Sequence, residues 1–340
     1  MVIGAAIDMP KILHVGDPHV KNDNLEESVR LIDFAIQQAK LHNAELFLAG
    51  DQYDGHGIVQ VPVLSFWMDS YKKIKQANVR SKSLIGNHDL TTDFKHSPMY
   101  VHTDETAVID RNGYIDGKVG FIGFIKKNDE FIAKANEMYR EGIRIIFCHA
   151  EFDGAKFESG MFCPNGIPLD VFPSDLLFIS GHIHDKQFIR NNAGIVRVIY
   201  PGTPRMLTRS DFGRKKALML IDTDTLEFTQ IDIPVEVSEP FNHIIVESLE
   251  DLSKIYNSER LYVDVKGSKE FIESILKQLP EKVKARSIPD RELAPSSLDI
   301  AESEGMVKSF KKYVDRYCTE NELGNSFASD LYKYLPGWSA

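Results

Sequence analysis

The heptapeptide LIGNHDL, residues 84–90, places an amide, an imidazole and a carboxylate in consecutive positions just where an apolar run ends at a glycine. The apolar residues before Gly86 predict a strand, and Asn87, His88 and Asp89 follow it directly. A single polar cluster after a strand is usually a turn or a helix cap. Its meaning therefore depends on whether the rest of the chain supplies partners.

Four other clusters have the same form, in which polar side chains follow a short apolar run. They occur in VGDPHV, LAGDQYD, IFCHAEF and ISGHIHD, and their polar members are Asp17, His19, Asp51, His149, His182 and His184. Each residue alone can be interpreted as a cap, a turn or an ordinary histidine. With His88, five of the chain's 11 histidines fall in the five clusters, which chance placement does not produce. The other six are interpreted as ordinary interior or surface residues, with His56 kept open.

The first third of the chain alternates short apolar runs with helix-like stretches. Strands are predicted at 11–15, 45–49 and 79–85, and amphipathic helices at 24–41 and 60–77. Strands separated by helices form βαβ units, so this order predicts an α/β sheet. The carboxyl ends of aligned strands meet at one edge, where open α/β sheets hold their ligands.

After residue 105 the predicted strands come closer together. The stretch AVIDRNGYIDGKVGFIGF carries Asn-Gly and Asp-Gly between apolar runs, which predicts a hairpin. A helix is predicted near 128–141. Further strands are predicted at 143–148, 176–180, 195–199, 217–222 and 226–233.

Three domains are predicted from these patterns. A large domain covers 1–235, and Pro234 and Pro240 bracket its end. Residues 241–290 are expected to form a small α/β domain, and 297–340 a polar-amphipathic helical tail.

Composition excludes several classes of protein. With 43% hydrophobic and 26% charged residues, the chain has the balance of a soluble globular protein, and no apolar run approaches the roughly 20 residues that span a bilayer. No membrane association is expected, and a cytoplasmic location is predicted. Three cysteines without a CxxC pair argue against thiolate chemistry. A net charge of −10 disfavours a protein that coats nucleic acid by electrostatics alone, but does not exclude nucleic acid as a substrate.

Two aspartates, one asparagine and four histidines form a set suited to transition metals. Imidazole nitrogen with carboxylate oxygen suits Mn²⁺, Fe²⁺ or Zn²⁺ better than Ca²⁺ or Mg²⁺. Seven ligands exceed the needs of one ion, so two ions are implied, with Asp51 as the candidate bridge. A two-metal site clamps the attacking and leaving oxygens of a phosphoryl displacement.

In their order along the chain, DxH, GD, GNHD, a lone His and GHxH resemble the five motifs of calcineurin-like metallophosphoesterases. The resemblance covers about residues 11–233 and implies a four-layer α/β sandwich of two packed mixed β-sheets flanked by helices. It implies that one ion is held by Asp17, His19, Asp51 and His184. It implies that the other is held by Asp51, Asn87, His149 and His182. His88 would then act as general acid toward the leaving oxygen, oriented by Asp89.

The motifs depart from those of protein Ser/Thr phosphatases, which read GDxHG, GDxVDRG and GNHE. The segment after GHxH is similar to the SbcD-type subunit of the double-strand-break repair nuclease, in a compact, phage-like version. That branch places Y-P-G-S and an arginine after a strand, and this chain has Thr203 for the serine. Tyr200, Thr203 and Arg205 are therefore candidate substrate-binding residues. Asp54 stands where some members have a histidine that helps to act on DNA ends.

This resemblance implies a Mn²⁺-dependent nuclease, with Mg²⁺, Fe²⁺ or Zn²⁺ as alternative ions. It implies exonuclease action on duplex DNA ends and endonuclease action on single strands, in DNA repair and recombination. The partners implied are a second copy of the chain, in a homodimer, and an SbcC-type ABC ATPase bound by the tail. DNA contacts are expected from Lys126, Lys127, Arg205, Arg209 and the run 214–216.

Three alternatives stay open. The enzyme could be a small-molecule phosphodiesterase of the same superfamily. It could be an inactivated scaffold, which is disfavoured because every ligand position is filled. The tail could pack on its own domain instead of on a partner.

Overall fold

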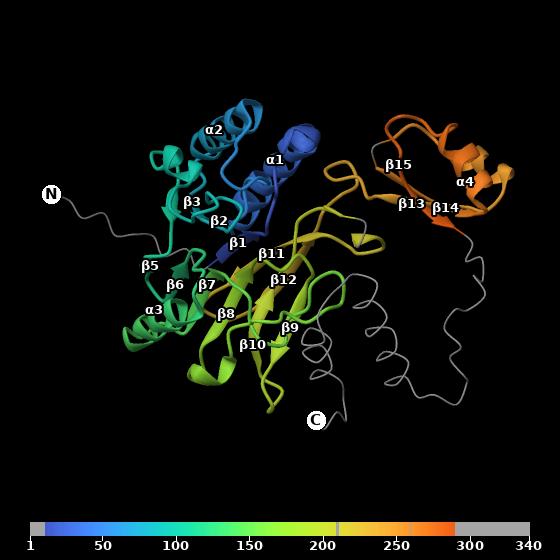
Figure 1. Ribbon diagram of the computed structural model, residues 1–340. Coiled ribbons are helices and arrows are strands. Elements are labelled where there is room, and N and C mark those ends of the chain that lie inside the picture. The colour runs from blue at the N-terminus through green and yellow to red at the C-terminus, as the bar shows by residue number, and fades with distance from the viewer. Residues whose placement is uncertain (1–10, 209–210, 259, 290–340) are drawn as a thin grey trace, which may run out of the picture. The chain divides into compact units, whose positions relative to one another are not determined.

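The computed structural model describes residues 11–208, 211–258 and 260–289 (Figure 1). Its first large sheet has six strands in the order β12-β11-β1-β2-β3-β4. These strands are β1 (Lys11–Val15), β2 (Glu45–Leu48), β3 (Ser81–Leu84), β4 (Ala107–Ile109), β11 (Ala217–Asp222) and β12 (Phe228–Asp232). Strands β1 to β4 run parallel, and β11 and β12 complete the sheet in antiparallel pairing.

The second large sheet also has six strands, in the order β5-β6-β7-β8-β10-β9. They are β5 (Tyr114–Asp116), β6 (Val119–Ile122), β7 (Ile145–His149), β8 (Leu177–Gly181), β9 (Gln187–Arg190) and β10 (Val196–Tyr200). The four central strands run parallel and the two edge strands antiparallel. Two mixed sheets confirm the predicted fold class.

Helices cover the outer faces of the two sheets, which gives four layers (Figure 1). The helices α1 (Leu25–His42) and α2 (Val61–Gln76) pack on the first sheet, and α3 (Asn128–Arg140) packs on the second. Short 3-10 helices are η1 (Asn22–Asn24), η2 (Pro98–His102) and η3 (Leu169–Val171). Strand β1 shows how the layers are built, because Leu13 and Val15 join the core under the helices while Ile12 joins the core between the sheets. The near-continuous apolar runs of the parallel strands follow from this burial on both faces.

Residues near its two ends determine where α1 begins and ends. This is the helix that follows Asp17 and His19. Glu26 and Glu27 lie in its first turn, and Lys40 and His42 in its last, so the charges complement the helix dipole. Asn43 ends the helix in the left-handed conformation, and its backbone N–H reaches the carbonyls of the last turn.

The predicted hairpin after residue 105 is correct only in its second half. Strands β5 and β6 form an antiparallel hairpin in which Asp116 pairs with Val119 across Gly117 and Lys118. Strand β4 instead pairs parallel with β3 in the first sheet. The turn at Asn112 and Gly113 therefore carries the chain from one sheet to the other, which an Asn-Gly pair alone does not reveal.

A third, three-stranded sheet follows, in the order β13-β14-β15. Its elements are β13 (Asn242–Val246), η5 (Leu249–Lys254), β14 (Leu261–Gly267), α4 (Lys269–Leu276) and β15 (Lys284–Pro289). This mixture of strands and helices agrees with the α/β character predicted for 241–290, whereas the domain boundaries themselves stay predictions. The predicted tail at 297–340 lies outside the described residues. Among the described helices, none combines the length and apolar character required to cross a bilayer.

Candidate metal centre

The five polar clusters lie at the carboxyl ends of five parallel strands. Asp17 and His19 follow β1, Asp51 follows β2, and Asn87 follows β3. In the second sheet, His149 ends β7, and the two histidines of GHIH follow β8. Because these strand ends converge where the two sheets meet, the structure brings together all seven side chains predicted as ligands.

The seven side chains form two groups that share Asp51. In the first group, Nε2 of His19 lies 3.2 Å from Nε2 of His184 and 3.7 Å from Oδ2 of Asp51. Asp17 adjoins both groups, since its Oδ2 accepts a hydrogen bond from the backbone N–H of His182. Asp51 therefore lies between the two groups, and its role as a bridge between two ions stays a prediction.

In the second group, three acceptor atoms surround Nε2 of His149. Oδ1 of Asn87 lies 2.9 Å from it, Nδ1 of His182 lies 3.3 Å from it, and Oδ2 of Asp51 lies 3.3 Å from it. Oδ1 of Asn87 also lies 2.8 Å from Nδ1 of His182. Asp51, His149 and His182 meet the geometric requirements for holding one ion.

Tight backbone turns bring these side chains so close together. His19, Asp51 and His182 adopt φ values of 43°, 51° and 79°, in the left-handed region that non-glycine residues rarely use. Such strain accumulates at functional sites, where the surrounding fold maintains it. A Cβ atom on Gly86 would lie 2.2 Å from Oδ1 of Asp51, which explains the glycine of the GNHD cluster.

The outer nitrogen of each histidine faces a hydrogen-bond acceptor. Nδ1 of His149 lies 2.9 Å from the carbonyl oxygen of Ala49. The other three histidines face carboxylates, and these pairs are His182 Nε2 with Glu151 at 2.7 Å, His184 Nδ1 with Glu158 at 2.5 Å and His19 Nδ1 with Asp54 at 3.3 Å, the last as an ion pair without hydrogen-bond geometry. An acceptor at the outer nitrogen holds the N–H there, which leaves the inner nitrogen with a lone pair.

With the rings in these tautomers, the inner atoms of both groups are acceptors that face one another, so an added proton or a metal ion is needed between them. Oδ1 of Asp17 is also buried and has no hydrogen-bond partner among the described residues. Buried acceptors of this kind require a cation. Imidazole nitrogens with carboxylate and amide oxygens are donors that first-row transition ions accept. The residues present thus fit divalent metal ions.

Electrostatics of the centre agree with that fit. Burial lowers the pKa of His149, but the carboxylates of Asp51 and Asp17 outweigh burial and raise it to about 10. Burial favours a raised pKa for Asp51, yet His149 and His19 hold it well below its usual range. The centre thus favours positive charge, supplied either by a proton on His149 or by a metal ion that displaces it.

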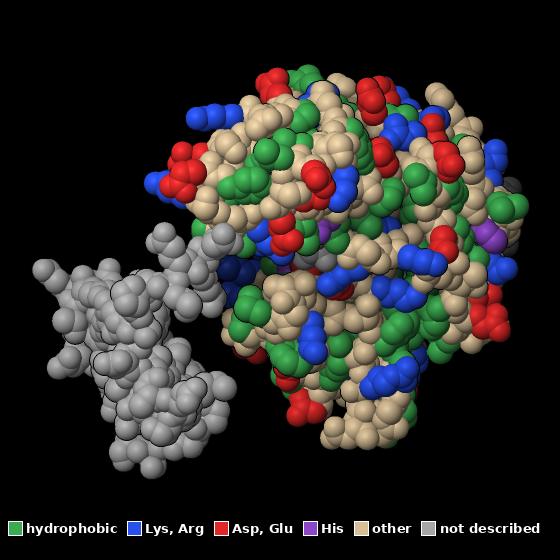
Figure 2. Space-filling view, turned by 90° about the vertical axis from the view of Figure 1, so that its right-hand side faces the viewer, with side chains coloured by type: hydrophobic (Ala, Val, Ile, Leu, Met, Phe, Trp, Pro, Cys, Tyr) green, Lys and Arg blue, Asp and Glu red, His purple; other side chains and the backbone are tan. Residues whose placement is uncertain are grey.

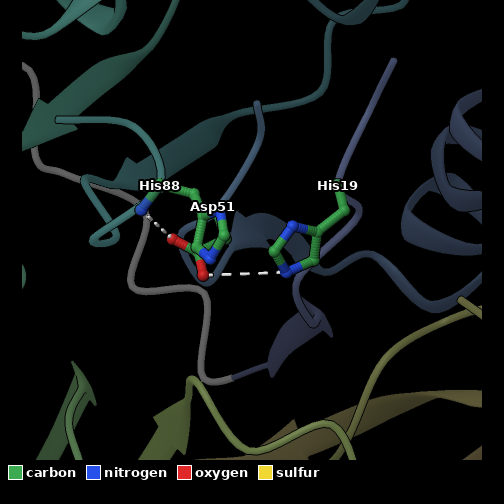
Figure 3. Close-up of side chains that lie close together, drawn as sticks. All are labelled: His19, Asp51 and His88. Carbon is green, nitrogen blue, oxygen red and sulfur yellow. Dashed lines mark hydrogen bonds and ion pairs between the residues drawn. The ribbon is translucent and has the colours of Figure 1, made fainter. Parts of the chain in front are cut away.

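His88 lies at the edge of the first group (Figure 3). Its backbone N–H donates to Oδ1 of Asp51 at 2.8 Å, and its Nδ1 lies 2.8 Å from the carbonyl oxygen of Asp54. The His56 ring stacks on it at 4.2 Å, so this histidine, kept open by the sequence, supports the His88 ring. His19, Asp51 and His88 could also hold an ion together, so geometry alone does not separate a ligand role for His88 from the predicted acid role.

Asp89 has a different place from the one predicted. Its buried carboxylate accepts hydrogen bonds from the backbone N–H groups of Tyr53 and Gly86, each at 2.9 Å. The prediction that Asp89 orients the His88 imidazole is wrong, because the backbone of Asp54 does so. Asp89 instead joins the loop after β2 to the loop after β3.

Tyr200, Thr203 and Arg205 were predicted to contact substrate, and their burial corrects this. The Tyr200 hydroxyl donates to the carbonyl oxygen of Ala150 and accepts from the N–H of Phe152. The hydroxyl of Thr203 donates to the carbonyl oxygen of Arg205. All three side chains are buried and support the loops of the centre.

Arg205 shows this supporting role most clearly. Its guanidinium donates to the Ser28 hydroxyl at 2.8 Å, to the carbonyl oxygen of His19 at 3.1 Å and to that of Pro18. Burial lowers the pKa of Arg205 to about 10, and the Glu27 carboxylate, 3.4 Å from the guanidinium, partly offsets this effect. Arg205 therefore fixes the loop of His19 to α1.

The remaining predicted cations are placed as follows. Lys126 and Lys127 are exposed beside the loop after β6. Arg214 pairs with Asp185, and Lys216 pairs with Asp211. Lys215 lines a cavity next to His184, whereas Arg209 lies outside the described residues.

Sequence reasoning missed two side chains of the centre, Glu151 and Glu158. Both lie in the irregular segment between β7 and η3. The only signal for Glu151 is its place two residues after the lone His149, and Glu158 has no signal in the sequence.

Comparisons with known proteins found a family model, two viral relatives and a solved structure. The family model described as calcineurin-like phosphoesterase matches residues 10–186. The putative phosphoesterase 244L of Invertebrate iridescent virus 6 is 25% identical over 295 residues, which are 80% of this chain and 99% of that protein. The putative phosphoesterase 078R of Invertebrate iridescent virus 3 is 25% identical over 212 residues, which are 56% of each chain. A solved structure described as a novel archaeal phosphodiesterase is 16% identical, covers 66% of this chain and 99% of that one, and has a TM-score of 0.35.

Proposed function

The chain belongs to the calcineurin-like phosphoesterase family, and from this premise we propose that it is a two-metal nuclease that hydrolyses DNA phosphodiester bonds. It would act in the cytoplasm in DNA repair or recombination, as an exonuclease on duplex ends and an endonuclease on single strands. The observation that carries the metal-dependent chemistry is the convergence of buried acceptors around Asp51.

The residues that would hold the ions follow from the two groups. Asp17, His19 and His184 would hold one ion, Asn87, His149 and His182 the other, and Asp51 both. Divalent ions bound there supply Lewis-acid polarisation of a phosphoryl oxygen and lower the pKa of a water nucleophile. Mn²⁺ is the ion we propose, because the resemblance to SbcD-type nucleases implies it; a mixed set of imidazole and oxygen ligands also fits Fe²⁺ or Zn²⁺.

His88 would act as the general acid. Its Nδ1 faces the carbonyl oxygen of Asp54, so Nδ1 carries a proton and Nε2 is the nitrogen available to the substrate. A protonated Nε2 could stabilise the leaving oxygen or donate its proton to it. The stacked His56 ring keeps the imidazole in this orientation.

DNA as the substrate is supported by resemblance rather than by surface charge. The order of motifs, followed by Tyr200 to Arg205, is similar to SbcD-type nuclease subunits. On the face drawn in Figure 2, Lys and Arg side chains are interspersed with Asp and Glu side chains. Affinity for DNA would therefore come from the metal centre and a few local cations rather than from a broad basic surface.

The proposed partners are a second copy of the chain and an ABC-type ATPase. The helical tail predicted at 297–340 is the segment we propose for ATPase docking. Deleting it would remove ATPase binding and leave hydrolysis of a small diester unchanged. Loss of folding on deletion would show that the tail is part of the core.

A small-molecule phosphodiesterase is the second candidate. The names of the viral relatives support phosphoester hydrolysis in general and do not separate a nucleic acid from a small diester. The two candidates differ in substrate. A nuclease degrades DNA, whereas a small-molecule phosphodiesterase hydrolyses simple diesters and leaves DNA intact.

The deciding experiment compares both substrates with the same purified protein. An end-labelled linear duplex, a labelled single strand and a chromogenic phosphodiester are each incubated with Mn²⁺, with Mg²⁺ or with EDTA. Mn²⁺-dependent degradation of DNA that disappears in His88→Asn supports the nuclease. Hydrolysis of the diester with both DNA substrates intact, also when the ATPase partner is added, would reject it.

A further inference from the structure

A groove of about 630 Å³ opens beside the metal centre. Its walls include the rings of Phe94, Tyr100 and Phe124, together with Ile85 and Leu90. No predicted metal ligand lines it. We call it the Phe94 groove, and it combines aromatic faces with a polar rim.

The inner end of the Phe94 groove adjoins the second metal group. The ring of Phe124 lies 6.3 Å from the ring of His182, nearly parallel to it, and 6.3 Å from the ring of His149. A second cavity of about 510 Å³ shares Phe124 and continues to Ala150 and Glu151, next to the same histidines. A ligand with its phosphate at the metals would therefore have its adjoining group beside Phe124.

Phe94 is held in the groove at a conformational cost. Its φ of 57° lies in the left-handed region, where an aromatic residue is an outlier. The surrounding loop is closed by hydrogen bonds, including those from Phe94 N–H to the Thr91 carbonyl and from His96 N–H to the Thr91 hydroxyl. The result is a partly exposed Phe94 ring 5.7 Å from the Phe124 ring.

Positive charge lies over these rings. Nζ of Lys126 lies 4.6 Å from the centre of the Phe94 ring. Neither Lys126 nor Arg111, which also lines the groove, forms an ion pair in the part of the chain that the structure describes. Three carboxylates also line the groove: Asp93 pairs with Lys95, Glu130 pairs with Lys127, and Asp110 accepts hydrogen bonds from Tyr100 and Asn112.

We infer that the Phe94 groove binds the unpaired nucleobase next to the scissile phosphate of a single-stranded DNA segment. An aromatic wall accepts the π-face of any base, and the cations over it suit the neighbouring phosphates. A base inside a duplex is already stacked and cannot enter, so the groove selects single strands and frayed ends. This inference rests on the proposed nuclease function and names the part of the DNA that the enzyme recognises.

The test measures binding that depends on the bases. A fluorescent oligothymidylate and an abasic strand of the same length are titrated by anisotropy into the full chain carrying His88→Asn, with Mn²⁺ present. We expect the thymine strand to bind about tenfold more tightly than the abasic strand. Adding Phe94→Leu should remove this ratio and leave the affinity for the abasic strand, because leucine keeps the apolar packing without a π-face.

Two controls make the result specific. Tyr139→Ala removes another aromatic ring that has a cation over it. This ring belongs to the last turn of α3, lies 3.9 Å from the guanidinium of Arg144, and lines neither cavity beside the metal centre. This variant should keep the tenfold ratio. The metal content of each variant, measured by elemental analysis, shows that the centre is still assembled.

The outcomes separate this inference from the nuclease proposal. Equal binding of the two strands, or a ratio that survives Phe94→Leu, overturns the groove, whereas Mn²⁺-dependent cleavage by the parent chain would then still support the nuclease. If the parent chain neither binds nor cleaves DNA, also when the ATPase partner is added, both are rejected. A ratio lost in Phe94→Leu and kept in Tyr139→Ala supports the inference.

Discussion

Nδ1 of His88 lies 2.8 Å from the carbonyl oxygen of Asp54, so the outward atom of this ring is Nε2. The same ring could also join His19 and Asp51 around an ion. Substituting His88 therefore distinguishes the two roles: loss of a general acid lowers the cleavage rate only, whereas loss of a ligand also lowers the metal content.

We predict that His88→Asn abolishes phosphodiester cleavage without loss of metal. Removal of a general acid typically costs about 10² to 10⁴ in rate. The metal ions should remain, because the seven other side chains are unchanged. Cleavage rates and elemental analysis of the same preparation check this, and a fall in metal content would reassign His88 as a ligand.

Glu151 and Glu158 are predicted to set metal affinity without touching the metals. Each carboxylate holds the outer nitrogen of a GHIH histidine, His182 or His184, and thereby fixes the ring and keeps the lone pair inside. Glu151→Ala and Glu158→Ala should each weaken Mn²⁺ binding about 10- to 100-fold. Isothermal titration calorimetry measures the affinity.

The glutamine variants and a distant glutamate complete that prediction. Glu151→Gln and Glu158→Gln keep an acceptor oxygen and should lose less affinity than the alanine variants. Glu137→Ala, an exposed residue that pairs with Lys134 on α3, should bind Mn²⁺ like the parent chain. Alanine variants with parental affinity would show that both glutamates are dispensable for the centre.

Asp89 is predicted to act on stability rather than on the acid. Asp89→Ala leaves the buried N–H groups of Tyr53 and Gly86 without an acceptor, so it should lower the free energy of unfolding by about 2–4 kcal/mol. Asp89→Asn retains one acceptor oxygen and should cost less. Urea unfolding followed by fluorescence gives the values. A stable Asp89→Ala protein that loses only catalytic activity would restore the role expected from the sequence.

The fold class and the positions of the clusters could be predicted from the sequence, because both depend on the pattern of apolar and polar residues over short stretches of the chain. Polar residues directly after parallel apolar strands lie at the same edge of the sheet, whatever the conformation of the loops. Asp51 and Asn87, which follow the neighbouring strands β2 and β3, could therefore be predicted to lie close together. The direction of a side chain within a tight turn is set by contacts distant in sequence. This is why Asp89, next to His88, turned out to bind the loop after β2.

The other errors have the same physical origin. Arg205 follows the GHxH region as a substrate-binding residue would, yet its guanidinium meets Ser28 and the carbonyl of His19, far away in sequence. Glu158 belongs to a segment without periodicity, so no local pattern marks it as a partner of His184. Tertiary hydrogen bonds of this kind can be found only in the folded chain.

His14 gives a prediction about pH. It lies on β1, buried between the sheets beside Phe47, and neither ring nitrogen has a hydrogen-bond partner among the described residues. Burial lowers the pKa of His14 to about 3. Between pH 6.5 and 3 the unfolded chain therefore binds a proton there that the folded chain does not. Stability from this site is complete above pH 6.5 and falls as the pH drops below it.

The loss should reach about 2 kcal/mol at pH 5 relative to pH 7.5, since each pH unit below the unfolded pKa costs about 1.4 kcal/mol. His14→Leu removes the titrating group, so its free energy of unfolding should change by about 2 kcal/mol less over the same interval. Urea unfolding at the two pH values, with EDTA present so that metal release does not contribute, measures both changes. If the free energy of unfolding depends on pH equally in the parent chain and in His14→Leu, the folded chain binds a proton at His14 as readily as the unfolded chain does, and the prediction is wrong.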